Sequence, residues 1–197
     1  MVVEGLPEPL GVLARVAAVL TRLDVPYFVA GSLASSLHGE PRSTNDIDLV
    51  ADLDARRAES LVADVGSDFY VDPGAVREAV ANRTSFNLVH LATATKVDVF
   101  LLTGEPFEVE RMRTRQRVAL GGAPVLEAFV DAPEHTVLRK LEWFDRGGRA
   151  SERQWRDAVG VLRVQGDRLD QARLRRWAGS LAVTDLLEQA LAEASEH

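Results

Sequence analysis

The chain has 197 residues, of which 46% are hydrophobic and 27% are charged, with a formal net charge of −7 and no cysteine. This composition is typical of a soluble globular protein with room for one large domain or a domain with an appended helical half. It excludes disulfides, thiolate metal sites and a cysteine nucleophile. The negative balance argues against a protein that coats nucleic acid by charge alone.

The apolar residues are not arranged as a membrane segment. No apolar run is long enough to cross a bilayer, and Met1-Val2-Val3-Glu4 lacks the basic stretch and apolar core of a signal peptide. We therefore expect a cytoplasmic protein with no membrane partner.

The charge is unevenly distributed along the chain. Residues 1–138 hold 12 basic and 20 acidic residues, whereas residues 139–176 hold 11 basic and 6 acidic residues. An acidic segment suits a cation, and a basic segment suits a polyanion such as a triphosphate or an RNA. On charge alone, solvated arginine-rich helix faces are the simpler explanation of the basic segment.

The first 130 residues alternate between helical and extended patterns. Apolar residues at helical spacing predict a helix over residues 9–23, which Asp24-Val25-Pro26 ends. The following predicted elements are a strand over 27–30, a helix over 33–37 with Ser32 as its N-cap, a turn at 38–41, a strand over 46–50, helices over 55–65 and 73–81, strands over 85–91 and 96–102, and a strand or hairpin over 118–126 around Gly121-Gly122.

The remaining residues show only helical patterns. Pro133 suits the first turn of a helix, and Ser151 with Gln154 forms a capping-box pattern. Helices are predicted over 131–145, 151–164, 169–178 and 184–194. We expect an α+β fold, in which a mixed β-sheet flanked by helices spans residues 1–130 and an all-helical half spans residues 131–197.

Two acidic residues share one face of the strand predicted at 46–50. Residues two apart on a strand point the same way, so Asp46 and Asp48 lie on one face while Ile47 and Leu49 point into the core. Two such carboxylates repel each other, and a hard divalent cation removes that cost. The spacing alone is a weak signal.

The same spacing recurs at Asp52 and Asp54, where no catalytic role is expected. Asp54 directly precedes the helix predicted at 55–65, so it is expected to be an N-cap. The acid pair must therefore be judged by its context.

Two other features suit phosphate and metal chemistry. Gly31 permits close backbone approach to a phosphate, and Ser32 lies where a helix begins and anions are favoured. On its own, this pair is explained better as a structural strand-to-helix turn. Asp98 lies between Val97 and Val99, so its carboxylate must be paired, hydrogen-bonded or metal-bound, unless it lies on the exposed face of an edge strand.

Read together, these features resemble the nucleotidyltransferase superfamily, which has the DNA polymerase β-like fold. Ala30-Gly31-Ser32 is followed by thirteen residues, then by Asp46-Ile47-Asp48-Leu49, and later by Val97-Asp98-Val99. A finer resemblance is to bacterial nucleotidyltransferase-like proteins related to the AbiEii toxins, which carry an Arg-x-Thr-x-Asp-x-Asp run and, in a helical half, a Lys followed by an Arg-Asp pair. The matching residues are Arg42, Thr44, Asp46, Asp48, Lys140, Arg153, Arg156 and Asp157.

The resemblance implies separate metal-binding and nucleotide-binding roles for these residues. Asp46, Asp48 and Asp98 would hold one or two Mg²⁺ (or Mn²⁺) ions that bridge the triphosphate of an NTP, and Asp98 would help to activate an acceptor hydroxyl. Lys140 would neutralise charge on the phosphates, and Asp157 would orient Lys140 or contact the nucleotide. The nucleotide-binding residues it implies are Gly31, Ser32, Arg42, Thr44, Lys140, Arg153 and Asp157.

Solvated positions are the alternatives for some of these candidates. A solvated helix face explains Lys140 and Arg153 as well as a catalytic role does. His38 is expected to lie in a solvated turn.

The expected function is transfer of a nucleoside monophosphate to a hydroxyl of an RNA end such as tRNA, of a protein or of a small molecule. The toxin of a toxin–antitoxin pair, with an antitoxin partner, is one form of this function. A non-catalytic nucleotide-binding regulator or scaffold is the second hypothesis, and an unrelated phosphohydrolase is the third. The chain has only 3 Trp, 2 Tyr and 7 Phe, without the aromatic–basic interleaving that stacks bases, so RNA stays open as an acceptor.

Overall fold

A computed structural model describes residues 8–121 and 125–196, so Gly122 of the predicted hairpin turn lies outside the described residues. Within these ranges, the regular elements in chain order are α1 (Leu10–Arg22), β1 (Tyr27–Ala30), α2 (Gly31–His38), β2 (Asp46–Ala51), α3 (Ala55–Val65), η1 (Gly66–Asp68), β3 (Phe69–Tyr70), α4 (Pro73–Asn82), β4 (Ser85–His90), β5 (Lys96–Leu101), α5 (Pro106–Thr114), β6 (Gln116–Gly121), β7 (Leu126–Val130), α6 (Pro133–Arg146), α7 (Glu152–Gln165), η2 (Gly166–Arg168), α8 (Gln171–Ser180) and α9 (Thr184–Ser195). None of the helices in this part of the chain combines the length and apolar character that crossing a bilayer requires.

The chain divides into two compact units. Unit 1 contains the described residues of 1–30 and 44–130, and unit 2 contains those of 31–43 and 131–197. Unit 1 therefore carries the whole sheet with α1, α3, α4 and α5, and unit 2 consists of helices and their connections.

The sheet of unit 1 has seven strands in the order β3-β4-β5-β2-β1-β7-β6. The pairs β2–β5 and β1–β7 are parallel, and the other pairs are antiparallel. The predicted mixed α+β class is confirmed. Along β2, Ile47 and Leu49 are fully buried, whereas Asp46 is exposed and Asp48 is half-buried, as the alternation predicts.

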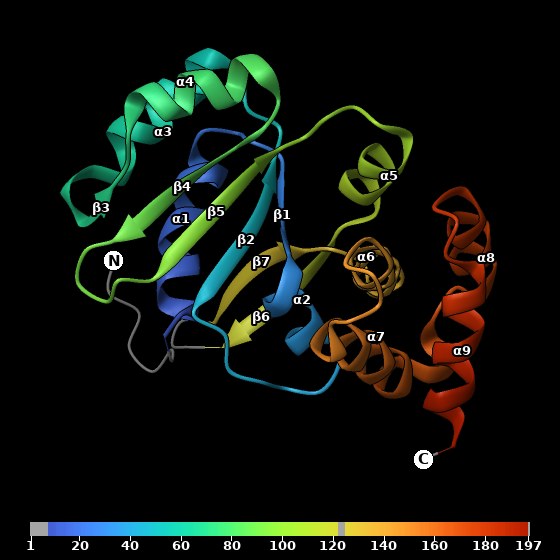
Figure 1. The fold of residues 1–197 in the computed structure, drawn as a ribbon. Coiled ribbons are helices and arrows are strands. Elements are labelled where there is room, and N and C mark those ends of the chain that lie inside the picture. Colours follow the sequence, from blue (N-terminus) through green and yellow to red (C-terminus); the bar gives the residue numbers. More distant parts are fainter. Residues whose placement is uncertain (1–7, 122–124, 197) are drawn as a thin grey trace. The chain divides into compact units, whose positions relative to one another are not determined.

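Helix α3 packs on α1 and α4, and these two helices contact the sheet of unit 1 at β7 and β4 (Figure 1). Helix α3 begins as predicted, because the carboxylate of Asp54 accepts a hydrogen bond from the backbone nitrogen of Arg57 at 2.8 Å. Asp54 is thus a helix cap, which separates it from the acid pair at the start of β2.

An unpredicted helix, α5, covers part of unit 1. Its Met112 packs with Phe28 and Ala30 of β1 and with Val50 of β2 in one buried cluster. Val50 lies two residues beyond Asp48 and therefore on the same face of β2. Apolar packing thus closes one end of the face on which Asp46 and Asp48 lie.

Unit 2 is built on the packing of α2 against α6 and α7, with α8 and α9 completing the helical group. Ser151 caps α7 by accepting from the backbone nitrogen of Gln154, as predicted. The expectation of a solvated His38 is wrong, because His38 is the last residue of α2 and is buried. Its Nε2 donates to the backbone carbonyl of Asp131 at 2.7 Å, and burial lowers the pKa of the ring, which favours the neutral form.

Gly39 lies where the end of α2 meets α7 in unit 2. A methyl carbon at this position would lie 2.8 Å from the backbone nitrogen of Val161 and 2.9 Å from the carbonyl carbon of Gly160. Because backbone atoms cannot move aside cheaply, we expect Gly39→Ala to lower the free energy of unfolding by about 1–3 kcal/mol. Urea unfolding followed by circular dichroism measures this loss.

Gly179→Ala is the matched control for Gly39→Ala. Gly179 lies in α8 of the same unit, and a methyl group there would have no neighbour within 4 Å. Alanine is the better helix former, so this change is expected to be neutral or to stabilise by up to about 1 kcal/mol. Equal effects of the two changes would contradict a close approach at Gly39.

Candidate functional site

The three predicted metal-binding acids of unit 1 lie on one face of two adjacent parallel strands. Asp48 of β2 is the register partner of Asp98 of β5, and Asp46 is the partner of Lys96. Neighbouring strands are about 4.8 Å apart, so the backbones of Asp48 and Asp98 lie side by side. Strand β5 lies between β4 and β2, so the edge-strand alternative for Asp98 is wrong.

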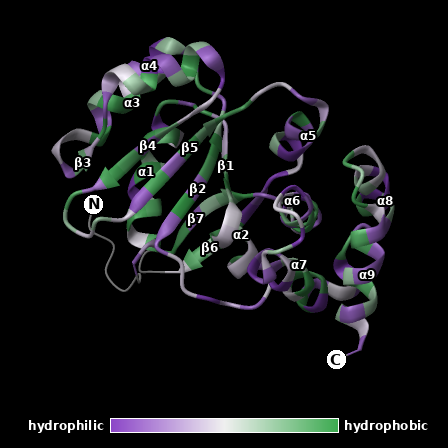
Figure 2. Ribbon diagram, in the orientation of Figure 1, coloured by the Kyte–Doolittle hydropathy of each residue, from purple (hydrophilic) through white to green (hydrophobic). Residues whose placement is uncertain are grey.

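The hydrophilic starts of β2 and β5 are adjacent in Figure 2. On the opposite face of these strands, Ile47, Val97 and Val99 are fully buried. Each strand is thus anchored by its apolar side chains, and this anchoring fixes which face presents the carboxylates.

Lys96 supplies positive charge to this face, and the sequence interpretation did not assign it a role. Its Nζ is 2.8 Å from Oδ2 of Asp98. The hydrogen bond to Asp98 raises the pKa of Lys96, and the negative charges of Asp98, Asp46 and Asp48 raise it further. The signal that would have found Lys96 is its spacing, because a residue two before Asp98 shares its strand face.

The donor chemistry of this face suits Mg²⁺ or Mn²⁺, since all three candidate ligands are carboxylates and both ions prefer oxygen. The three carboxylates of Asp46, Asp48 and Asp98 do not meet at one point, as the sequence interpretation implies they should. Among the residues that the structure describes, no group of three or more His, Cys, Asp or Glu side chains lies close enough together to hold a metal ion. The residues fit the ion in type and strand register, and the Asp98 carboxylate is held by Lys96.

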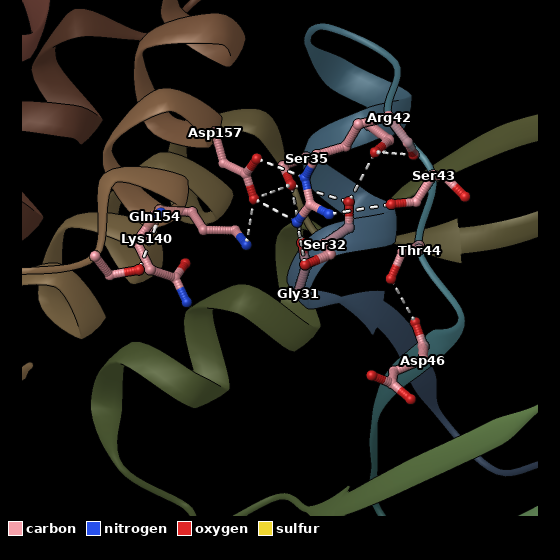
Figure 3. A network of polar contacts seen from close by, with 12 residues as sticks. Gly31, Ser32, Ser35, Arg42, Ser43, Thr44, Asp46, Lys140, Gln154 and Asp157 are labelled. Carbon is pink, nitrogen blue, oxygen red and sulfur yellow. Dashed lines mark hydrogen bonds and ion pairs between the residues drawn. The ribbon is translucent and has the colours of Figure 1, made fainter.

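Thr44 lies at the start of β2 in unit 1. Its Oγ1 donates to the backbone carbonyl of Asp46 at 3.2 Å, as Figure 3 shows. This bond ties the segment before β2 to the strand and thereby helps to fix the position of Asp46.

In unit 2, Asp157 of α7 joins several predicted phosphate-binding residues (Figure 3). Arg42 binds Asp157 through both carboxylate oxygens, with Nε to Oδ1 at 2.8 Å and Nη2 to Oδ2 at 2.9 Å. Lys140 of α6 lies with its Nζ 2.8 Å from Oδ2 of Asp157. The hydroxyl of Ser35 lies 3.2 Å from the same oxygen, and Ser35 is a member of the network that sequence reasoning missed.

This network is sheltered from water. The side chains of Lys140 and Asp157 are 6% and 7% exposed, so a solvated helix face does not describe Lys140. Burial alone would raise the pKa of Asp157, but the hydrogen bonds from Arg42 and Lys140 outweigh it and hold the pKa below its ordinary value. Asp157 is therefore ionised at neutral pH and holds both cations in place.

The segment Gly31-Ser32 begins α2 in a way that differs from the expected cap. Gly31 has φ of 60°, a left-handed conformation that glycine adopts without steric cost. Ser32 lies inside the first turn of α2, and its hydroxyl accepts from Nη2 of Arg42. The expectation that Ser32 is the N-cap is thus wrong, because α2 already begins at Gly31. The Ser32 hydroxyl also accepts from the guanidinium of Arg42 and does not cap the helix.

A cavity of about 270 Å³ opens beside this network in unit 2. Its lining includes Ser35, Arg42, Asp157 and the exposed residues Arg153 and Arg156 of α7. Three guanidinium groups outnumber the carboxylates of Glu40 and Asp157 in this lining, so the cavity suits an anion such as phosphate. The structure therefore brings the predicted residues Arg42, Arg153 and Asp157 together at one cavity.

Comparison with known proteins identifies the fold. No protein-family model matches the sequence, and no curated protein is similar to it at a significant level. Among solved structures, an antigenic nucleotidyltransferase-like protein from Paracoccidioides brasiliensis is 18% identical with a TM-score of 0.57, covering 92% of this chain and 90% of its own. ANT(2″)-Ia in complex with adenylyl-2″-tobramycin is 14% identical with a TM-score of 0.56, covering 87% of this chain and 95% of its own. The chain therefore has a nucleotidyltransferase-like fold.

Proposed function

We propose that this protein is a metal-dependent nucleotidyltransferase that moves a nucleoside monophosphate from an NTP to an acceptor hydroxyl. The observation that carries the proposal is the in-register pairing of Asp48 with Asp98, with Asp46 on the same face. A nucleotidyltransferase-like fold supports the reaction class. Neither observation alone would be sufficient, because folds host many functions and acid pairs are common.

The residues of unit 1 are proposed to bind the metal, and those of unit 2 are proposed to bind the phosphates. On unit 1, Asp46, Asp48 and Asp98 would hold Mg²⁺ or Mn²⁺. The bound ion would supply positive charge to the phosphoryl oxygens of the substrate. Asp98 would also accept the proton of the acceptor hydroxyl.

On unit 2, the backbone at Gly31 and Ser32 would bind phosphate oxygens, because a helix N-terminus favours anions. Lys140 and Arg42 would neutralise charge on the triphosphate or on the leaving pyrophosphate. Asp157 would position both cations. Its bidentate bond to Arg42 supports this positioning role.

The acceptor and the biological role are finer proposals. The resemblance to AbiEii-related proteins supports a toxin with an antitoxin partner, and the fold neighbour bound to adenylyl-2″-tobramycin supports a small-molecule acceptor. The basic segment 139–176 supports RNA. One assay separates these acceptors: purified protein, Mg²⁺ and each labelled NTP are incubated with tRNA, with a cell protein extract or with aminoglycosides, and label transfer is measured. Absence of transfer to every acceptor, with Mn²⁺ as well as Mg²⁺, contradicts the proposed activity.

A non-catalytic nucleotide-binding module is the second candidate. The observation that favours it is that the acids of unit 1 are not gathered into a three-ligand cluster among the described residues. Calorimetric titration with ATP and Mg²⁺ discriminates the two, since binding without any turnover favours the module. Turnover would exclude it.

The cavity lined by Arg42, Arg153 and Arg156 yields a prediction about nucleotide affinity. We expect Arg153→Ala to weaken NTP binding by about five- to tenfold, because one guanidinium–phosphate contact contributes about 1–1.5 kcal/mol at an exposed position. Calorimetry or the KM for NTP measures the change. Arg175→Ala is the matched control, because Arg175 lies in unit 2 outside the cavity and pairs with Glu188 at 3.0 Å. Equal NTP affinities of Arg153→Ala and Arg175→Ala would show that Arg153 does not bind the nucleotide.

A further inference from the structure

Lysine is rare in this protein, and both lysines are paired with candidate site residues. Of the 23 basic residues, only Lys96 and Lys140 are lysines, and the rest are arginines. Lys96 pairs with Asp98 and Lys140 pairs with Asp157. In other ion pairs of the described residues, such as those of Arg15 with Asp68, Arg22 with Asp64 and Arg163 with Glu40, the cation is an arginine.

The two lysines differ in how firmly they are held. Lys140 has a side chain that is 6% exposed, whereas that of Lys96 is 43% exposed. A lysine ammonium is a compact, strongly hydrated charge on a flexible stem, while an arginine fork binds a carboxylate in a fixed bidentate geometry. The ion pair of Lys96 with Asp98, whose side chain is 22% exposed, is therefore easier to break than the buried pair of Lys140 with Asp157, because contact with solvent lowers the contribution of an ion pair.

Lys96 also lies on the strand face that a metal ion would use. It is the register partner of Asp46, and it is two residues before Asp98 on the same face of β5. Its Nζ bonds to Oδ2 of Asp98 at 2.8 Å. A dication bound to that carboxylate would therefore lie within a few ångströms of the ammonium, where like charges repel strongly.

The same ion pair lowers the repulsion among the three acids of this face. Three carboxylates on one face repel each other, and some positive charge must lower that repulsion. Lys96 supplies positive charge to this face through its ion pair with Asp98.

We propose that Lys96 is a resident counter-ion of the carboxylate face formed by Asp46, Asp48 and Asp98, and that a divalent cation must displace it in order to bind. Lys96 thereby lowers the metal affinity of the free protein and stabilises the metal-free face. The inference rests on the proposed function, because it assigns the metal to these three acids. It adds a residue that sets how tightly the metal is held.

The test is metal affinity in the absence of substrate. Mn²⁺ is titrated into the full chain while free Mn²⁺ is followed by its electron paramagnetic resonance signal. We expect Lys96→Met to bind Mn²⁺ on the order of tenfold more tightly, because one like charge is removed a few ångströms from the ion in a partly hydrated site. We expect Lys96→Arg to bind no more tightly than the wild type, because the bidentate fork is harder to displace.

Arg22→Met is the matched charge control. Arg22 pairs with Asp64 at 2.9 Å in unit 1, and their side chains are 60% and 33% exposed. This variant changes the net charge as Lys96→Met does, so unchanged Mn²⁺ affinity is expected. An equal gain in both variants would attribute the effect to net charge and overturn the inference.

A second readout concerns the metal-free state. With EDTA present, Lys96→Met is expected to melt at a lower temperature than the wild type, and Mn²⁺ is expected to raise its Tm by more than it raises that of the wild type. Circular dichroism verifies that each variant is folded. If Lys96→Met fails to fold, Lys96→Arg still tests the inference, because a gain in its Mn²⁺ affinity would overturn it.

Asp48→Asn separates this inference from the proposed function. If Asp48→Asn leaves saturable Mn²⁺ binding intact, the metal is not bound by this face and the proposed function is contradicted. If Asp48→Asn abolishes binding but Lys96→Met leaves the affinity unchanged, only the inference about Lys96 is overturned.

Discussion

Asp48→Asn is expected to reduce nucleotide transfer by about a thousandfold or more while leaving the fold intact. Asparagine has nearly the same shape but lacks the charge that would hold the metal, and a metal ion contributes several kcal/mol of transition-state stabilisation. Asp48 pairs in register with Ala30 on one side and Asp98 on the other, so it lies at the middle of the acidic face. The buried neighbours Ile47 and Leu49 keep β2 in place in the variant.

Single-turnover transfer of labelled nucleotide measures the effect, and the melting temperature checks that the fold is retained. Asp52→Asn is the matched control, because Asp52 belongs to the second pair of acids with this spacing, Asp52 and Asp54, for which no catalytic role is expected. Asp52 pairs with Arg83 at 3.5 Å on an exposed surface. It is expected to retain wild-type transfer. If Asp48→Asn and Asp52→Asn transfer nucleotide at equal rates, Asp48 has no role in the chemistry.

Asp157→Asn is expected to produce the largest loss of stability, about 3–5 kcal/mol in the free energy of unfolding. The change removes the carboxylate that pairs with the buried Lys140 and with Arg42, and breaking a buried ion pair from one side costs this much. Urea unfolding at neutral pH measures the loss. The double variant Asp157→Asn with Lys140→Met is expected to recover part of it, because the buried ammonium is removed as well.

Asp185→Asn is the control for this loss. Asp185 pairs with Arg149 at 3.3 Å in the same unit, and both side chains are at least half exposed. An exposed pair contributes about 0–1 kcal/mol, so little change is expected. A loss from Asp157→Asn no greater than that from Asp185→Asn would contradict the structural role of the network.

The Asp157 contribution also predicts a pH dependence. The folded state holds the pKa of Asp157 below its ordinary value of 3.8, so its stabilising contribution is fully present above that pH. The contribution is lost as the pH falls below 3.8 and through the lowered pKa. The difference in stability between the wild type and Asp157→Asn should therefore shrink in acid and stay constant near neutral pH.

Most of the regular elements were predictable because their apolar residues repeat at the period of the element. Strand β2 shows this, since its alternation correctly placed Ile47 and Leu49 in the core. Helix α5 was not predictable, because it is rich in charge and buries few apolar side chains, Phe107 and Met112 among them. The two-residue strand β3 was missed for a different reason, since it is too short to carry a period.

The candidate site was predictable only in part. The acids of β2 and β5 follow from spacing, because strand residues two apart share a face. The partnership of Asp157 with Arg42 joins residues that are 115 positions apart, and no local pattern carries such a pairing. The hydrogen bond of the buried His38 likewise joins it to Asp131, which is 93 positions away in the sequence.

Helix α2 interrupts the sheet-bearing unit in the sequence, since residues 31–43 belong with the C-terminal helices although β1 and β2 flank them. Neither compact unit is therefore encoded by one uninterrupted stretch of gene. A truncation after residue 130 would leave α2 attached to the sheet fragment and deprived of α6 and α7, the helices it packs on. The helical portion thus cannot be exchanged between proteins as a cassette, and any recombination that replaces it must also replace the segment between β1 and β2.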